Sequence, residues 1–191
     1  RLAAEIHGQL GGLYLRRGQA DDAQDHYQKD LEIRNKLNSS KSTMAAAKMS
    51  LGKVFYSKGQ YVQAEEVFQE SKKVLEQEES YFSDYISCLE NIGFCKFDVE
   101  NFTEAEIYWT EACKKLEAQS SFSMDLARFY RHMSYVYLRT DRKDEAIQIL
   151  TKKIQIETQL CPGSLPLSES YTALADALKE KGKFDVALKF L

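Results

Sequence analysis

Histidine and cysteine are the residues through which this chain could bind a metal ion or attack a substrate. The histidines are His7, His26 and His132, and the cysteines are Cys88, Cys95, Cys113 and Cys161. No histidine stands four residues from another His or Cys, the spacing that places two ligands on one helical face, and no CxxC pair occurs. We therefore expect no metal site and no cofactor.

The sequence also lacks the spacings typical of catalytic sites. No Ser/His/Asp or Cys/His combination is recognisable, and there is no glycine-rich loop for phosphate. The pair Gly11-Gly12 lies within a helix-forming stretch, where close packing explains it. We expect no enzymatic activity.

Composition favours a single soluble, all-α folded unit. The chain has 191 residues, of which 43% are hydrophobic and 29% charged, but only two prolines and nine glycines. Most stretches are rich in Ala, Leu, Lys, Glu and Gln, which lose little on entering a helix. No apolar run approaches the roughly 18 residues that suggest a membrane span, and a net charge of −3 without long single-sign blocks argues against nucleic-acid binding.

Small and large residues recur with a period of 41. The alanines of this pattern are Ala23, Ala64, Ala105, Ala146 and Ala187. Four residues after them stand Tyr27, Phe68, Trp109, Leu150 and Leu191, and twelve residues before them stand Gly11, Gly52, Gly93, Ser134 and Ala175. A small residue on one helix and an Ala-x-x-x-aromatic pair on the next let two helices pack closely, so the pattern predicts repeated helical hairpins with the large rings in the core.

Short breaks separate the two helices of each predicted hairpin. They are Arg17-Gly18-Gln19, Lys58-Gly59-Gln60, Glu100-Asn101, Thr140-Asp141-Arg142 and Lys181-Gly182-Lys183. Such residues suit a left-handed cap at the end of a first helix. Linkers between hairpins are expected near residues 37–43, 77–82, 119–123 and 160–167.

These residues resemble the tetratricopeptide repeat (TPR), whose signature includes Leu-Gly-x-x-Tyr and Ala-x-x-x-Phe. The first repeat has Leu10-Gly11-x-x-Tyr14 with Ala23-x-x-x-Tyr27, and the second has Leu51-Gly52-x-x-Phe55 with Ala64-x-x-x-Phe68. The resemblance implies a right-handed α-solenoid of about five hairpins forming a single array over residues 1–191. The repeats would span about 4–44, 45–85, 86–126, 127–167 and a truncated 168–191. The period of 41 instead of 34 is similar to the long repeats of kinesin light chains.

The resemblance also implies where a partner would bind. In the family, the first helices line a concave wall, and positions two, five, six, nine and thirteen of each repeat face inward. The partner-binding candidates at these positions are Lys53, Glu90, Asn91, Arg128, Arg131, His132, Tyr135 and Arg139, and Ser87, Phe94, Asp176 and Glu180 share the same wall.

Three of these candidates have a specific expected role. Asn91 resembles the family's clamp on a peptide backbone, because one amide both donates and accepts hydrogen bonds. Arg128 and Arg131 could bind a carboxylate through paired N–H donors. The set does not match a chaperone-tail carboxylate clamp, because Met49 and His132 stand where that clamp has cations.

The sequence therefore predicts a protein-protein interaction scaffold or adaptor that binds a peptide or helical segment in its groove. Two alternatives remain open: a structural or self-association module of a larger assembly, such as a ciliary or cytoskeletal one, and a regulatory domain of a larger enzyme or transcription regulator. The cysteine pattern favours a cytoplasmic location. Residues 45–126 hold 8 Lys/Arg and 15 Asp/Glu, whereas residues 127–191 hold 11 and 8. We expect glutamates such as Glu65, Glu66 and Glu70 to solvate an outer helix face, and the alternative is that the uneven charge steers a partner of opposite polarity into register.

Overall fold

The computed structural model describes residues 1–190 and shows only helices in them. Leu191, which we expected to be the last large residue of the 41-residue pattern, lies outside the described residues. The chain divides into two compact units, Arg1–Asn101 and Phe102–Leu191. The all-α fold is confirmed, and the single array over residues 1–191 stays a prediction.

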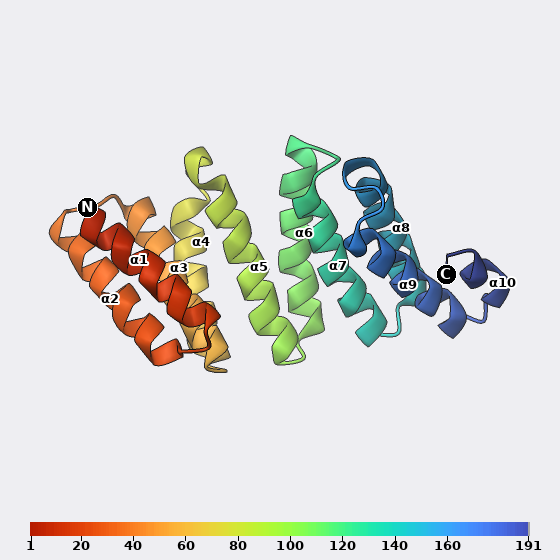
Figure 1. Cartoon of the computed structure of the whole chain (residues 1–191), viewed down its shortest axis with the longest axis horizontal. Helices are drawn as coiled ribbons and strands as arrows, with labels where there is room; N and C mark the ends of the chain where they lie inside the picture. The colour runs from red at the N-terminus through yellow and green to blue at the C-terminus, as the bar shows by residue number, and fades with distance from the viewer. Residues whose placement is uncertain (191) are drawn as a thin grey trace. The chain divides into compact units, whose positions relative to one another are not determined.

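The first unit contains two complete hairpins and the first helix of a third. Its helices are α1 (Leu2–Arg16), α2 (Ala20–Lys36), α3 (Lys41–Ser57), α4 (Tyr61–Leu75), the short 3-10 helix η1 (Glu79–Tyr81) and α5 (Phe82–Asp98). Helix α1 pairs with α2, and α3 pairs with α4 (Figure 1). The first helices α1, α3 and α5 also touch one another in this order, so they form one layer of the unit.

The second unit repeats this arrangement. Its helices are α6 (Phe102–Gln119), α7 (Met124–Arg139), α8 (Lys143–Leu160), α9 (Leu165–Glu180), α10 (Phe184–Ala187) and the 3-10 helix η2 (Leu188–Phe190). Helix α7 pairs with α8, and α9 packs on both α8 and α10. Side-chain hydroxyls of Ser123 and Ser164 cap the starts of α7 and α9 by accepting hydrogen bonds from backbone N–H groups three residues on.

All five predicted breaks fall between consecutive helices. Each contains one residue in the left-handed region, and these residues are Gly18, Gly59, Glu100, Asp141 and Gly182, one repeat apart. The N–H of the residue after each of these donates to the carbonyl five residues earlier, for example from Gln19 to Tyr14 at 3.0 Å. This bond pattern is the Schellman motif, which ends a helix and reverses the chain.

The small and large residues of the repeat pack as predicted. A Cβ atom added to Gly11 would lie 2.7 Å from the ring of Tyr27, and one added to Gly52 would lie 2.7 Å from the ring of Phe68. All five alanines of the pattern are fully buried. Trp109 is also buried, at 1% exposure, so it belongs to the core as expected.

The linker between the second and third hairpins is tied back to the start of α3. Ser42 Oγ donates to Glu78 Oε1 at 2.5 Å, and the Thr43 and Tyr81 hydroxyls lie 3.0 Å apart. The additional residues of a long repeat are thus used here to bring Tyr81 beside the first two hairpins. No helix among residues 1–190 is long and apolar enough to cross a bilayer.

Candidate functional site

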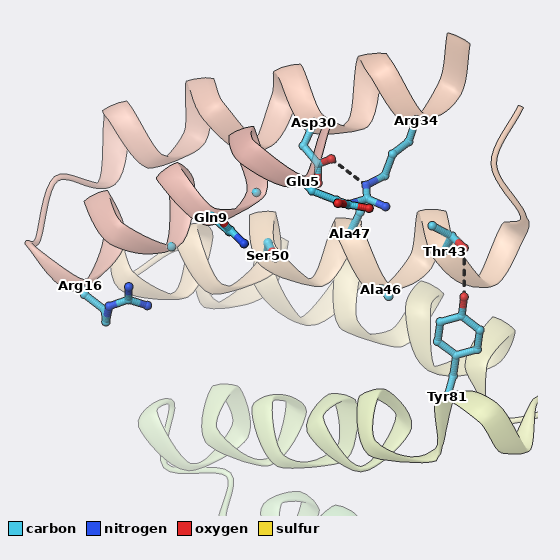
Figure 2. A pocket seen from close by; sticks show the side chains of 12 residues that line it. Glu5, Gln9, Arg16, Asp30, Arg34, Thr43, Ala46, Ala47, Ser50 and Tyr81 are labelled. Atoms are coloured by element: carbon cyan, nitrogen blue, oxygen red, sulfur yellow. Dashed lines mark hydrogen bonds and ion pairs between the residues drawn. The ribbon is translucent and has the colours of Figure 1, made fainter. Parts of the chain in front are cut away.

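A pocket of about 600 Å³ lies in the first unit on the layer of first helices, and we call it the first-hairpin pocket (Figure 2). It is lined by Glu5, Gly8, Gln9, Gly12, Arg16, Asp30, Arg34, Thr43, Ala46, Ala47, Ser50 and Tyr81. Helices α1, α2 and α3 supply its walls. Tyr81, hydrogen-bonded to Thr43, stands at one end, and Arg16 stands at the other in Figure 2.

Small residues make the walls of this pocket nearly bare. Gly8 and Gly12 face it from α1, and Ala46, Ala47 and Ser50 face it from α3. A Cβ atom at Gly12 would lie 3.4 Å from the Tyr27 hydroxyl, which is ordinary contact. A ligand main chain can therefore approach the helix backbones closely.

An ion pair between a buried carboxylate and a half-buried guanidinium lies at the bottom of the first-hairpin pocket. Asp30 is only 3% exposed, and its Oδ1 accepts a hydrogen bond from Arg34 Nε at 2.7 Å. The two residues are one helical turn apart on α2, so their side chains meet on the same face. Because a buried carboxylate is costly without a partner, Arg34 is what allows Asp30 to lie there.

The second unit has a pocket of about 310 Å³, which we call the fourth-hairpin pocket. It is lined by Met124, Asp125, Ala127, Arg128, Arg131, Lys153, Glu157, Pro166 and Glu169. At its bottom, Lys153 Nζ lies 2.9 Å from Glu157 Oε1 and donates to Ser170 Oγ, which lies 2.6 Å from Glu157 Oε2. All three residues are buried, so this is a closed polar cluster.

The two pockets occupy the same positions of the repeat, three repeats apart. Arg128 and Arg131 of the fourth hairpin correspond to Glu5 and Gly8 of the first. The buried pair Lys153 and Glu157 corresponds to Asp30 and Arg34, with the charges reversed, and Ser170 corresponds to Ala47. The second and third hairpins have Ser71 with Leu75 and Ala112 with Leu116 at these positions, so only the first and fourth carry an ion pair there.

The predicted site residues of the second unit lie on α7. Arg131 and Arg139 are exposed, and Tyr135 is 50% exposed. Arg128 is half-buried, with Nη2 2.9 Å from Asp125 Oδ1 and its guanidinium 5.7 Å from the centre of the Phe129 ring. Arg128 and Arg131 both line the fourth-hairpin pocket, and their joint binding of a carboxylate stays a prediction.

His132 differs from the expectation. It is only 3% exposed, and its ring packs 5.1 Å from the ring of Trp109 and edge-on to the ring of Phe129 at 5.7 Å. The position that faces inward in the resemblance is turned into the core here because a flat aromatic ring fits between these two neighbours. We therefore leave His132 out of the candidate binding surface.

The predicted residues of the first unit lie outside the first-hairpin pocket. Lys53 is exposed on α3, close enough to Asp84 of α5 to counteract the rise that burial causes in the pKa of that carboxyl. Glu90 and Asn91 are half-buried on α5. Asn91 Nδ2 donates to the Ser87 carbonyl of its own helix at 2.6 Å, so one of its donors is already used.

Sequence reasoning overlooked the first-hairpin pocket. The inward positions of the first repeat are Glu5, Gly8, Gln9, Gly12 and Arg16, and all five line it. Two of them are glycines, which offer no side chain to a search for binding groups. The sequence did contain one indication of the pocket. Asp30 and Arg34 are charged at two positions where the second and third hairpins have small or apolar residues.

The histidines and cysteines form no site of three metal ligands among the described residues. Spacing alone missed that His7 and His26 meet across the first hairpin, with their Nδ1 atoms 2.9 Å apart. Burial raises the pKa of Cys88, Cys95 and Cys113 to about 12, so these thiols stay protonated and act as core residues.

The helices pair in antiparallel fashion, and the same left-handed turn interrupts the chain every 41 residues. These two features define an α-helical repeat protein. Residues 2–77 match the tetratricopeptide repeat family model. The match covers the first two hairpins, and the described residues beyond it have the same α-helical repeat fold.

Solved structures with the same fold include long-repeat proteins. BtubC (BKLC) from P. vanneervenii is 19% identical, with a TM-score of 0.87 over 98% of this chain and 76% of its own. A kinesin light chain-like repeat protein from Podosopora anserina is 15% identical, with a TM-score of 0.80 over 97% and 90%. The Rap conjugation gene regulator of plasmid pLS20, solved with the Phr* peptide, is 13% identical, with a TM-score of 0.74 over 98% and 51%. No curated protein sequence matches the chain.

Proposed function

We propose that this protein is a non-catalytic interaction module that binds an extended segment of a partner protein on its first helices. The observation that carries the proposal is the pair of equivalent pockets at inward-facing positions of the first and fourth hairpins. The fold is shared with a regulator that was solved with a peptide, which supports peptide binding as the mode.

The exposed side chains around the fourth-hairpin pocket suit an acidic segment. Arg131 and Arg139 make no ion pair among the described residues, and Tyr135 offers an exposed aromatic ring between them on α7. A guanidinium binds a carboxylate through two parallel hydrogen bonds, and tyrosine adds apolar contact with little loss of entropy. We expect Arg128 to contribute after exchanging Asp125 for the ligand, because this exposed pair contributes little to stability.

Selection of peptides from an unbiased display library tests the proposal. Arg131→Glu should weaken the selected peptides at least ten-fold, because it replaces attraction by repulsion. Lys114→Glu on α6 makes the same change of charge at another exposed position of the unit and should leave affinity within about two-fold. Equal losses from the two substitutions, with circular dichroism unchanged, would show that the pocket is not the site.

A second candidate function is self-association through the end of the second unit. Phe184 and Leu188 are 62% and 68% exposed, and Val186 beside them is 43% exposed. Apolar residues gathered in this way can pair with a second copy. Sedimentation of the protein and of Phe184→Glu/Leu188→Glu separates the two ideas, since only self-association predicts a concentration-dependent dimer that the substitutions abolish.

A further inference from the structure

We propose that the first-hairpin pocket takes an arginine side chain of the partner segment, inserted over Gly8 and paired with Asp30 and Glu5. The inference rests on the proposed function and specifies the ligand of one of its two pockets. Three observations support it. The Asp30 carboxylate points one oxygen into the pocket, acidic groups lie close together there, and glycines on α1 leave space for a ligand side chain.

Asp30 directs one oxygen toward the pocket. Its Oδ1 accepts from Arg34, whereas Oδ2 has no hydrogen-bond donor among the described residues. Oδ2 lies 3.5 Å from the place that a Cβ atom on Gly8 would occupy, so it faces the space above this glycine. Because the pocket is open, water can reach Oδ2 in the free protein, and a cationic donor brought by a ligand would replace that water with a charge-assisted hydrogen bond.

The local charge favours a cation. Glu5 lines the same pocket as the Asp30/Arg34 pair, and in Figure 2 it lies toward the same end as that pair. Arg16 is eleven residues further along α1, roughly 16 Å along the helix axis, where salt screens its charge. The contact of Glu5 with Arg1 at 3.5 Å is between exposed groups, so a ligand cation can replace Arg1.

The shape of the pocket suits a long side chain with a flat cationic head. The bare walls at Gly8, Gly12 and Ala47 leave room for the methylene stem, and the volume of about 600 Å³ is nearly twice that of the fourth-hairpin pocket. The planar guanidinium has donors on two sides, so it can reach Asp30 Oδ2 and the Glu5 carboxylate together.

The fourth hairpin supports this assignment through its own residues. Where the first hairpin has Glu5, Gly8 and Asp30, the fourth has Arg128, Arg131 and Lys153. In the fourth hairpin, the guanidinium of Arg131 therefore stands at the position of Gly8, and the residues around it suit an acidic ligand. With glycine at that position and acids around it, the guanidinium has to come from the ligand.

Titration with N-acetyl-L-arginine amide, followed by 15N-edited NMR of the whole chain, tests the inference. The expected result is a saturable shift of the Gly8, Gly12, Ala47 and Ser50 amide signals. N-acetyl-L-citrulline amide has nearly the same shape without the charge and should bind at least ten-fold more weakly. Equal shifts from both probes, or no saturable shift at these amides up to about 50 mM, would overturn the inference.

Two substitutions locate the effect. Glu5→Gln should weaken the arginine probe about three-fold or more, and Gly8→Leu should abolish its binding by filling the pocket. Gln28→Leu, an exposed change on α2, is the matched control and should have no effect. Peptides selected from the display library separate this inference from the proposed function: peptides that bind the first helices without any preference for arginine would leave the function standing and refute this inference.

Discussion

The first and fourth hairpins show how one repeat framework is given two different surfaces. The first pocket lies between α1, α2 and α3, and the second between α7, α8 and α9. At the bottom of each, two residues one helical turn apart form an ion pair. In the fourth hairpin, Ser170 closes off the pair by hydrogen bonding to both of its members. In the first, glycine leaves the pair open toward the pocket. The backbone fixes where a pocket forms, and a few side chains decide its size and charge.

The largest expected difference concerns the two buried ion pairs. Lys153→Ala leaves Glu157 buried without its cation and should cost about 3 kcal/mol of unfolding free energy, whereas Arg34→Ala should cost about 1 to 2 kcal/mol because water can reach Asp30 through the open pocket. Urea unfolding of both variants measures the difference. The comparison fails if Arg34→Ala is the more damaging change.

A double substitution sharpens this result. Lys153→Ala/Glu157→Leu gives the fourth hairpin the Ala and Leu of the third hairpin, Ala112 and Leu116, which are buried in this structure. Replacing a buried ion pair by apolar residues is often neutral or stabilising, so the double variant should recover most of the loss. A double variant as unstable as Lys153→Ala would show that the charges are not the cause.

Two glycines on the same helix should respond in opposite directions. Gly11→Ala places a Cβ atom 2.7 Å from the Tyr27 ring and should cost about 2 kcal/mol through overpacking. Gly8→Ala meets its nearest atom, Asp30 Oδ2, at 3.5 Å and should stabilise α1 by about 0.5 to 1 kcal/mol. Thermal unfolding of the two variants decides. A stable Gly11→Ala would mean that the helices of the first hairpin are further apart than described.

The smallest expected effect is at the breaks. Asp141 holds φ at 58°, and Gly59 holds φ at 74° at the equivalent position of the second hairpin. Asp141→Gly should therefore stabilise the second unit by about 0.5 kcal/mol, even with the loss of the exposed ion pair to Lys143, whereas Gly59→Ala should destabilise the first by about 1 kcal/mol. Unfolding free energies that change by less than 0.2 kcal/mol in both would contradict the argument from backbone conformation.

The fold was predictable from sequence because packing within each hairpin requires residues of the same size at positions that recur every 41 residues. A residue such as Ala64 needs to be small and Phe68 needs to be large whatever surrounds the hairpin, and the structure confirms both. The left-handed break was predictable even at Asp141, where no glycine marks it.

The site was less predictable because it depends on side-chain direction. The positional rule of the family selected Arg131 and Tyr135, which are exposed, but also His132, which is buried against Trp109. It gave no weight to Gly8, since a missing side chain carries no chemistry by itself. Only the structure shows that this absence opens a path to Asp30.

Photo-cross-linking tests the central claim that the partner binds on the first helices. A peptide selected from the display library would carry a photoreactive residue, and mass spectrometry would identify the residues of this protein to which it attaches. The account predicts attachment to pocket residues of α1, α3, α7 or α9. Attachment confined to the exposed faces of α2, α4 or α8 would contradict it.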